Sequence, residues 1–475
     1  MLPLANQHIG TSAHLVASKY IRPFFALAFV WLVVVALVSD GIFDTGDGIL
    51  HYQMARWSWK HPELLLHHWG KPVFTLLCSP FAQAGYKGAI LFNVFCHLGA
   101  AWLTWRIAER MKLPFAFLAG PLLLFAPISY GVAQSGLTEP LFAFTLMLGI
   151  YFVVAGRNVV AACVISLLPF VRTEGFLLAP LFAIFFLIRK EYLAMFLLAS
   201  GTVLYSLAGG LFVHHDFLWV LNQNPYRGEE MYGHGTLLHF IDKNEFIFGW
   251  SLTALVAIGL CSLFFRSKMT PPHSLAEIIL VFGCLIVFFT AHSIFWWKGL
   301  CGSLGLLRVM ACIMPCAVLV GLRGLQLLTR PYSKYKVAIS LTLFIAIITT
   351  MYNNFRLHDI VLNPDDQQES IANLVSSIRE SKLETRMIYY GHPLVTHFLD
   401  KDPFDQQQCI EMWGLRENPS LKKSAIVIWD SHFGPQQYDI SEDQLKAMPQ
   451  LREVIRLSIS NGANPKFTWI VCEVE

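Results

Sequence analysis

Charged side chains are scarce in this sequence. Asp, Glu, Lys and Arg make up 14% of its 475 residues, against about 25% in soluble globular domains. Hydrophobic residues make up 55%, and the mean hydropathy is +0.51. Runs of roughly 20 mostly apolar residues, the length that crosses a bilayer, follow one another along the chain. This composition excludes a soluble globular chain. We expect a lipid bilayer around the protein and no nucleic-acid partner.

Metal-type cysteine spacings are also missing, because no CxxC or Cys/His pattern occurs. Most of the ten cysteines lie inside apolar runs, where they are expected to pack as small apolar residues. Cys409 and Cys472 lie in a polar region and could pair. We detect no internal repeat.

Two processing signals are absent. The first apolar run, residues 23–39, follows Lys19 and Arg22 and leads into acidic residues instead of a small-residue cleavage site, which predicts a retained span. The one Asn-x-Ser/Thr-like site, residues 418–420, is blocked by Pro419. The lack of a usable glycosylation site favours a bacterial inner membrane over the endoplasmic reticulum.

The apolar runs predict about eleven spans, of which those between 114 and 171 are short enough to be broken or re-entrant. The spans are expected near residues 23–39, 88–105, 114–130, 139–155, 158–171, 175–188, 192–213, 246–265, 276–296, 306–328 and 337–352. With the N-terminus in the cytoplasm, every inner turn is basic, as the positive-inside rule requires. These turns contain Arg106, Arg110, Lys112, Arg157, Arg189, Lys190, Arg266, Lys268, Arg323, Arg330, Lys334 and Lys336.

The chain divides into three parts. Residues 1–22 form a cytoplasmic N-terminus, and residues 23–352 form a transmembrane domain with outer loops at 40–87 and 214–245. Residues 353–475 are more polar, and short strand-like and helical runs in them predict a soluble α/β domain on the outer side. The predicted fold class is thus an α-helical polytopic membrane protein with a small C-terminal α/β domain.

The acids near the membrane gather on the outer side. Residues 44–52 (DTGDGILHY) place Asp44 and Asp47 three positions apart around Gly46, and His51 and Tyr52 follow at helical distance. In one interpretation Asp47 caps an aromatic-rich surface helix that ends near Trp59. In the other, which is compatible with the first, the carboxylates do chemistry.

Three further outer turns carry charge. Residues 134–140 (QSGLTEP) place Glu139 at the start of a span, and residues 169–175 (PFVRTEG) place Arg172 and Glu174 between two spans. Residues 296–308 contain Lys298, three glycines and then Arg308. Each has an ordinary interpretation as a helix cap or a snorkelling side chain, but the topology brings all of them to one membrane face. Acids beside cations there suit a reaction that takes a proton from one substrate and releases a phosphate from another.

These motifs resemble the GT-C membrane glycosyltransferases, which include protein O-mannosyltransferases and aminoarabinose transferases. The resemblance rests on DTGDGILHY (44–52), SGLTEPLFAF (135–144), PFVRTEG (169–175) and GSLGLLRVMACIMP (302–315). It implies a hexosyltransferase-type, mannosyltransferase-like enzyme with a periplasmic active site. The donor would be a sugar on a polyprenyl phosphate, and the acceptor a hydroxyl of a glycan, lipid or protein.

The resemblance also implies residue roles. Asp47, or its rival Asp44, would be the general base, typically with inversion at the sugar carbon, and Glu139 would orient the acceptor or a cation. Arg172 and Arg308 would stabilise the leaving phosphate. The remaining candidates for substrate binding are His51, Tyr52, Glu174 and Lys298.

The sequence departs from parts of the family pattern. The first loop has DxxD in place of DxD, and Lys298 follows Trp296-Trp297 where oligosaccharyltransferases have Asp. We expect no certain cofactor, although Asp44, Asp47 and Glu139 could hold Mg²⁺ or Mn²⁺. The alternative function is a transporter or lipid flippase, whose signs would be broken helices and charges at mid-membrane.

Overall fold

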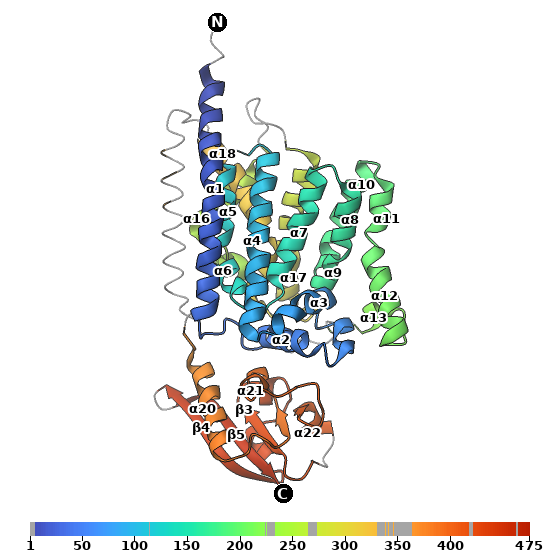
Figure 1. Ribbon diagram of the computed structural model, residues 1–475, viewed down its shortest axis with the longest axis vertical. Helices are drawn as coiled ribbons and strands as arrows, with labels where there is room; N and C mark the ends of the chain where they lie inside the picture. Colours follow the sequence, from blue (N-terminus) through green and yellow to red (C-terminus); the bar gives the residue numbers. More distant parts are fainter. Residues whose placement is uncertain are drawn as a thin grey trace.

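A computed structural model shows a helical bundle with a small sheet domain beneath one end (Figure 1). It describes residues 5–113, 115–223, 225, 233–264, 273–329, 338, 341, 345, 363–417, 421–461 and 464–475, with side chains left out at 5–20 and 460–466. The long helices run roughly side by side, and α2 and α3 lie across the end that faces the sheet domain.

The first half of the bundle contains α1 (Ala5–Val38), α2 (Asp47–Trp57), η1 (Pro62–Leu66), α3 (Pro72–Ala82), α4 (Tyr86–Arg110), η2 (Ala116–Leu118), α5 (Ala119–Leu124), α6 (Pro127–Ala133), α7 (Glu139–Val154), α8 (Asn158–Ser166) and α9 (Leu168–Val171). The second half contains α10 (Gly175–Ile188), α11 (Tyr192–Leu197), α12 (Ser200–Phe212), α13 (Trp219–Asn222), α14 (His239–Asp242), α15 (Asn244–Ile247), α16 (Trp250–Cys261), η4 (Glu277–Phe282), α17 (Gly283–Lys298), η5 (Leu307–Ile313) and α18 (Met314–Thr329).

Helices lie where ten of the eleven spans were predicted, but not all are long enough to cross a membrane by themselves. In the described residues five helices have the length and hydropathy of a span, or six if the bent pair α5–α6 is counted as one. That pair bends by 61°, so the region near 114–130 is broken, as its short apolar run allowed. The predicted span at 337–352 lies outside the described residues except for single positions.

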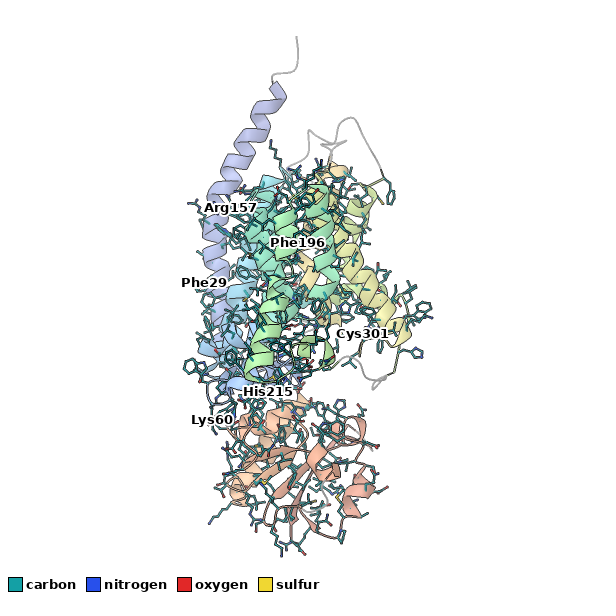
Figure 2. All side chains as sticks on the ribbon, turned by 90° about the vertical axis from the view of Figure 1, so that its right-hand side faces the viewer. Phe29, Lys60, Arg157, Phe196, His215 and Cys301 are labelled. Atoms are coloured by element: carbon teal, nitrogen blue, oxygen red, sulfur yellow. The ribbon has the colours of Figure 1, made fainter. Side chains whose placement is uncertain are left out.

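Labelled side chains mark the two ends and the middle of the bundle. Figure 2 places Arg157 toward one end, while Lys60 and His215 lie at the other end beside the sheet domain. Phe29 and Phe196 lie between these levels on the outside of the bundle, and both are exposed. Exposed apolar side chains at mid-height are expected where lipid is the solvent.

Small residues allow the closest helix contacts. A Cβ at Gly259 of α16 would lie 2.1 Å from the carbonyl oxygen of Val320, and one at Gly324 of α18 would lie 2.0 Å from that of Leu255. Glycine is therefore required at both positions for α16 and α18 to pack backbone against backbone, as in many membrane helix pairs.

The predicted position of Arg323 in a turn is wrong. It was predicted in a basic inner turn, but it lies within α18 and only 4% of it is exposed. Its Nε and Nη2 donate to the two oxygens of Glu277 at 2.6 and 2.7 Å, and its Nη1 donates to Gln326 at 2.8 Å. The ion pair joins α18 to the π-helical turn η4, because a buried charge is stable only when it is paired.

The C-terminal domain is the predicted α/β domain. Its elements are α20 (Asp366–Glu380), β1 (Ile388–Tyr390), α21 (Pro393–Phe398), β2 (Cys409–Glu411), α22 (Trp413–Glu417), β3 (Ile426–Asp430), α23 (Phe433–Gln436), α24 (Glu442–Lys446), β4 (Leu451–Asn461) and β5 (Asn464–Val474). The strand order is β2-β1-β3-β5-β4, with β1 parallel to β2 and β3, and β5 antiparallel to β3 and β4. Cys409 and Cys472 lie on strands that are not neighbours, and both are free thiols.

Candidate active site

The start of α2 presents two carboxylates to the bundle. The helix begins at Asp47, as expected, but the carboxylate that accepts a hydrogen bond from its first turn belongs to Asp44. Asp44 Oδ1 accepts from the Gly48 backbone N–H at 2.7 Å. The N-cap position is occupied by Gly46, so the prediction that Asp47 caps the helix is wrong. Asp47, freed from capping, keeps 42% of its side chain exposed against 19% for Asp44.

A close backbone contact brings Glu139 beside this pair. A Cβ at Gly136 would lie 2.2 Å from the Gly48 carbonyl oxygen, so glycine is required where the two turns meet. Asn93 of α4 fixes the second turn by donating to the carbonyl oxygens of Ser135 and Leu137, both at 2.7 Å. Glu139, the first residue of α7, is fully buried behind this contact.

Two arginines join the acids into one cluster. Arg308, from η5, forms ion pairs with both Asp44 and Asp47, and its Nε lies 3.7 Å from Glu139 Oε1. Arg172 Nη1 lies 2.7 Å from the same Glu139 oxygen, and its Nη2 lies 2.6 Å from Glu174 Oε1. Six of the predicted site residues, from four separate turns, thus meet at one end of the bundle. We call this set, together with Lys71 described next, the outer cluster.

Lys71 is a member of the cluster that the sequence reasoning missed. It precedes α3 with a positive φ of 61°, and only 4% of it is exposed. Its Nζ donates to Thr173 Oγ1 at 3.0 Å, between Arg172 and Glu174. Burial lowers the pKa of Lys71 to about 7, although Glu174, Asp47 and Glu139 act in the opposite direction. The available signal was a lysine between glycine and proline (Gly70-Lys71-Pro72) in the outer loop.

Other candidates lie apart from the ion pairs or at their edge. Tyr52 accepts a hydrogen bond from Arg56 at 3.3 Å and contacts His397 of the C-terminal domain. Lys298 lies 3.7 Å from the centre of the Trp297 ring, and no ion pair of Lys298 occurs in the described part of the chain. His51 is buried and stacks on Trp69 with ring centres 4.5 Å apart. The proposed binding roles of these three side chains stay predictions.

A divalent metal finds little room in this arrangement. The guanidinium of Arg308 lies among Asp44, Asp47 and Glu139, the acids that a metal would need. Within the described ranges, no three His, Cys, Asp or Glu side chains converge as metal ligands would. The positive charge beside Asp44, Asp47 and Glu139 is supplied by Arg308.

No family model matches the chain, and no curated protein matches it. Among solved structures the chain is similar to the crystal structure of ArnT from Cupriavidus metallidurans bound to undecaprenyl phosphate. The TM-score is 0.59 at 14% sequence identity, over 96% of this chain and 98% of that chain. The chain has the GT-C fold. It is a multi-pass membrane protein, and the similarity includes its C-terminal domain because almost the whole of both chains is covered.

Proposed function

We propose that the protein is a glycosyltransferase that moves a sugar, a hexose or a relative of one, from a polyprenyl phosphate to an acceptor hydroxyl. The observation that carries the proposal is the outer cluster, in which acids able to take a proton lie within one side-chain length of the buried Lys71 and of the partly buried Arg172 and Arg308. The solved structure that shares the fold holds undecaprenyl phosphate, a lipid of the expected donor class.

Asp47 is the better candidate for the general base. In the proposed step the acceptor oxygen attacks the anomeric carbon and its proton passes to Asp47. The bond from that carbon to the phosphate oxygen breaks, and the electron pair leaves with the polyprenyl phosphate. Asp47 has more exposed surface than Asp44, whose Oδ1 is already bonded to Gly48, so an incoming hydroxyl reaches Asp47 more easily.

The cations would bind the departing phosphate. Charge develops on the phosphate oxygens as the bond breaks, and fixed positive groups in a site poor in water stabilise that charge. The candidates are Arg308, which pairs with the partly exposed Asp47, together with Lys71 and Arg172. Attack from the side opposite the phosphate would invert the sugar carbon. We place this reaction on the periplasmic face of a bacterial inner membrane, with the N-terminus in the cytoplasm.

A panel of radiolabelled sugars on undecaprenyl phosphate tests the proposal. The purified full-length protein in lipid nanodiscs should release undecaprenyl phosphate from at least one donor and label an acceptor from a membrane extract. Unlabelled undecaprenyl phosphate should compete with that donor. If no donor gives transfer or hydrolysis, the proposal is contradicted and a transporter is favoured.

A further inference from the structure

The C-terminal domain contacts the same segment that carries the paired acids. Gln368, in the first turn of α20, is 2% exposed. Its Nε2 donates to the Ile42 carbonyl oxygen at 2.8 Å, and its Oε1 accepts from the Ile42 backbone N–H at 2.9 Å. One side-chain amide thus satisfies both backbone groups of a residue two positions before Asp44.

A second buried amide holds the other end of the segment. Gln53 of α2, 2% exposed, donates through Nε2 to Thr396 Oγ1 of α21 at 2.7 Å. Ile42 and Gln53 flank Asp44 and Asp47 in the sequence. The C-terminal domain therefore binds the segment that carries the carboxylates on both sides. The hydrogen bonds involved are buried, and breaking them would leave buried polar groups without partners, which costs free energy.

Charged contacts farther along the chain make a third attachment between the two domains. Lys60 and His61 both contact Asp402 at 2.9 Å, and Arg56 contacts Asp400 at 2.8 Å. Most of the Asp400 side chain is exposed, so the Arg56–Asp400 pair contributes little free energy. The fully buried Asp402, in contrast, depends on Lys60 and His61 as partners. These contacts lie beyond Gln53, away from Asp44 and Asp47, and can hold the domains together without fixing the acids.

The local sequence would allow Gln368 to form a capping-box hydrogen bond within its own helix, but Gln368 does not form it. Asp365 caps α20 by accepting from the Gln368 N–H at 2.8 Å, and a glutamine at this spacing normally bonds back to the cap residue as a capping box. Gln444 does so in the same domain, where its Oε1 accepts from the Ser441 N–H at 2.7 Å. Gln368 instead forms its side-chain hydrogen bonds with Ile42, 326 positions away.

We propose that Gln368 is a positioning residue that acts through Ile42 to hold Asp44 and Asp47 against Arg308, so that the C-terminal domain sets the rate of transfer. The inference rests on the proposed function of the outer cluster. Asp44 both bonds to Gly48 and pairs with Arg308, so a shift of the backbone at Ile42 displaces the start of α2 as well. A general base displaced by about 1 Å loses up to about 100-fold in rate.

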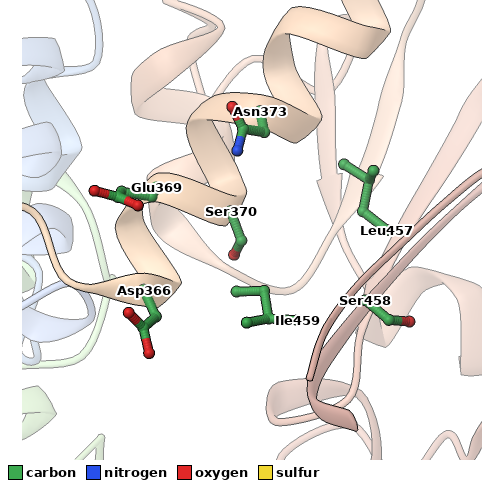
Figure 3. A pocket seen from close by; sticks show the side chains of 7 residues that line it. All are labelled: Asp366, Glu369, Ser370, Asn373, Leu457, Ser458 and Ile459. Atoms are coloured by element: carbon green, nitrogen blue, oxygen red, sulfur yellow. The ribbon is translucent and has the colours of Figure 1, made fainter. Parts of the chain in front are cut away.

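Gln368→Met tests this, because it keeps the volume of the side chain and removes both hydrogen bonds. In the full-length protein we expect kcat to fall about 10- to 100-fold with the donor KM nearly unchanged. Gln368→Glu should recover activity as the pH falls, since the protonated carboxyl can again donate to the Ile42 carbonyl. The matched control is Asn373→Ala, on an exposed face of the same helix where it lines an open groove with Leu457 (Figure 3). Gln444→Ala controls for a lost cap.

Hydrogen exchange separates this inference from the proposed function. Backbone amides at 42–50 should exchange faster in Gln368→Met and not in Asn373→Ala. If the parent protein transfers no sugar but this exchange pattern holds, only the proposed function fails. Parental kcat in Gln368→Met, or faster exchange spread over the whole C-terminal domain in place of 42–50, would overturn the positioning role.

Discussion

Two ion-pair clusters lie at opposite ends of the bundle and differ in how their charges are matched. At the end away from the C-terminal domain, Arg323 donates to both carboxylate oxygens of Glu277 and to Gln326, and the two charged residues are 4% and 2% exposed. One base faces one acid. His273 Nδ1, from the segment before η4, also lies 3.2 Å from Glu277.

The outer cluster has more acids than cations. Four carboxylates share two arginines and one lysine, and Asp47 keeps a large exposed surface. Arg308 and Arg323 are fifteen residues apart, roughly 20 Å or more along η5 and α18. A closed pair inside a membrane protein joins helices, whereas an open cluster with acids in excess can take a proton or exchange a partner. The matching of opposite charges, more than the presence of charge, therefore distinguishes a structural cluster from a reactive one.

Asp47→Asn should give the largest effect. The amide cannot take a proton from the acceptor, so kcat should fall about 10²- to 10⁴-fold, while the protein stays folded because the amide still fits beside Arg308. Transfer of labelled sugar is measured against Glu63→Gln, which alters an exposed acid of the same outer loop. Full activity in Asp47→Asn would move the base to Asp44 or outside the cluster.

Glu277→Gln should affect stability more than rate. It leaves Arg323 buried without a counter-charge, which costs about 3–5 kcal/mol, and so thermal unfolding in detergent should occur at a lower temperature. At temperatures where the variant is folded, kcat should match the parent because the outer cluster is untouched.

The matched control for this variant is the double substitution Glu277→Gln with Arg323→Met. It removes the stranded charge and should regain much of the lost stability. A large loss of kcat in the folded Glu277→Gln protein would show that the inner pair communicates with the outer site, and the contrast between the clusters would fail.

Much of this architecture could be predicted from the sequence, because apolar runs and basic turns report directly on the bilayer. The convergence of Asp44, Asp47, Glu139, Arg172 and Arg308 followed from topology alone, since each begins or ends an apolar segment on the same side. The C-terminal strands were found by their short apolar runs, with ends that differ by a few residues.

The missed features depend on contacts between distant segments. Lys71 lies in a loop that carries no charge pattern, and only folding buries it beside Thr173. Arg323 looked like one more basic turn because its partner Glu277 is 46 positions away. Asp47 was ranked ahead of Asp44 on the family resemblance alone, because the bond from Gly48 that occupies Asp44 depends on the φ and ψ of the turn.

Lys71 should give the smallest and most specific effect, a dependence of donor binding on pH. A sugar phosphodiester keeps one negative charge across neutral pH, whereas burial lowers the pKa of Lys71 to about 7. Below that pH the lysine is charged and attracts the phosphate, and above it the proton is lost. We therefore expect kcat/KM for the donor to fall several-fold, roughly, as pH rises through 7. In the pH profile of kcat the same fall, or limb, should lie at higher pH, because bound phosphate stabilises the charged form of Lys71. Lys71→Met should bind the donor weakly at every pH and lose this limb, and a parental limb in that variant would assign the titration to another group of the outer cluster.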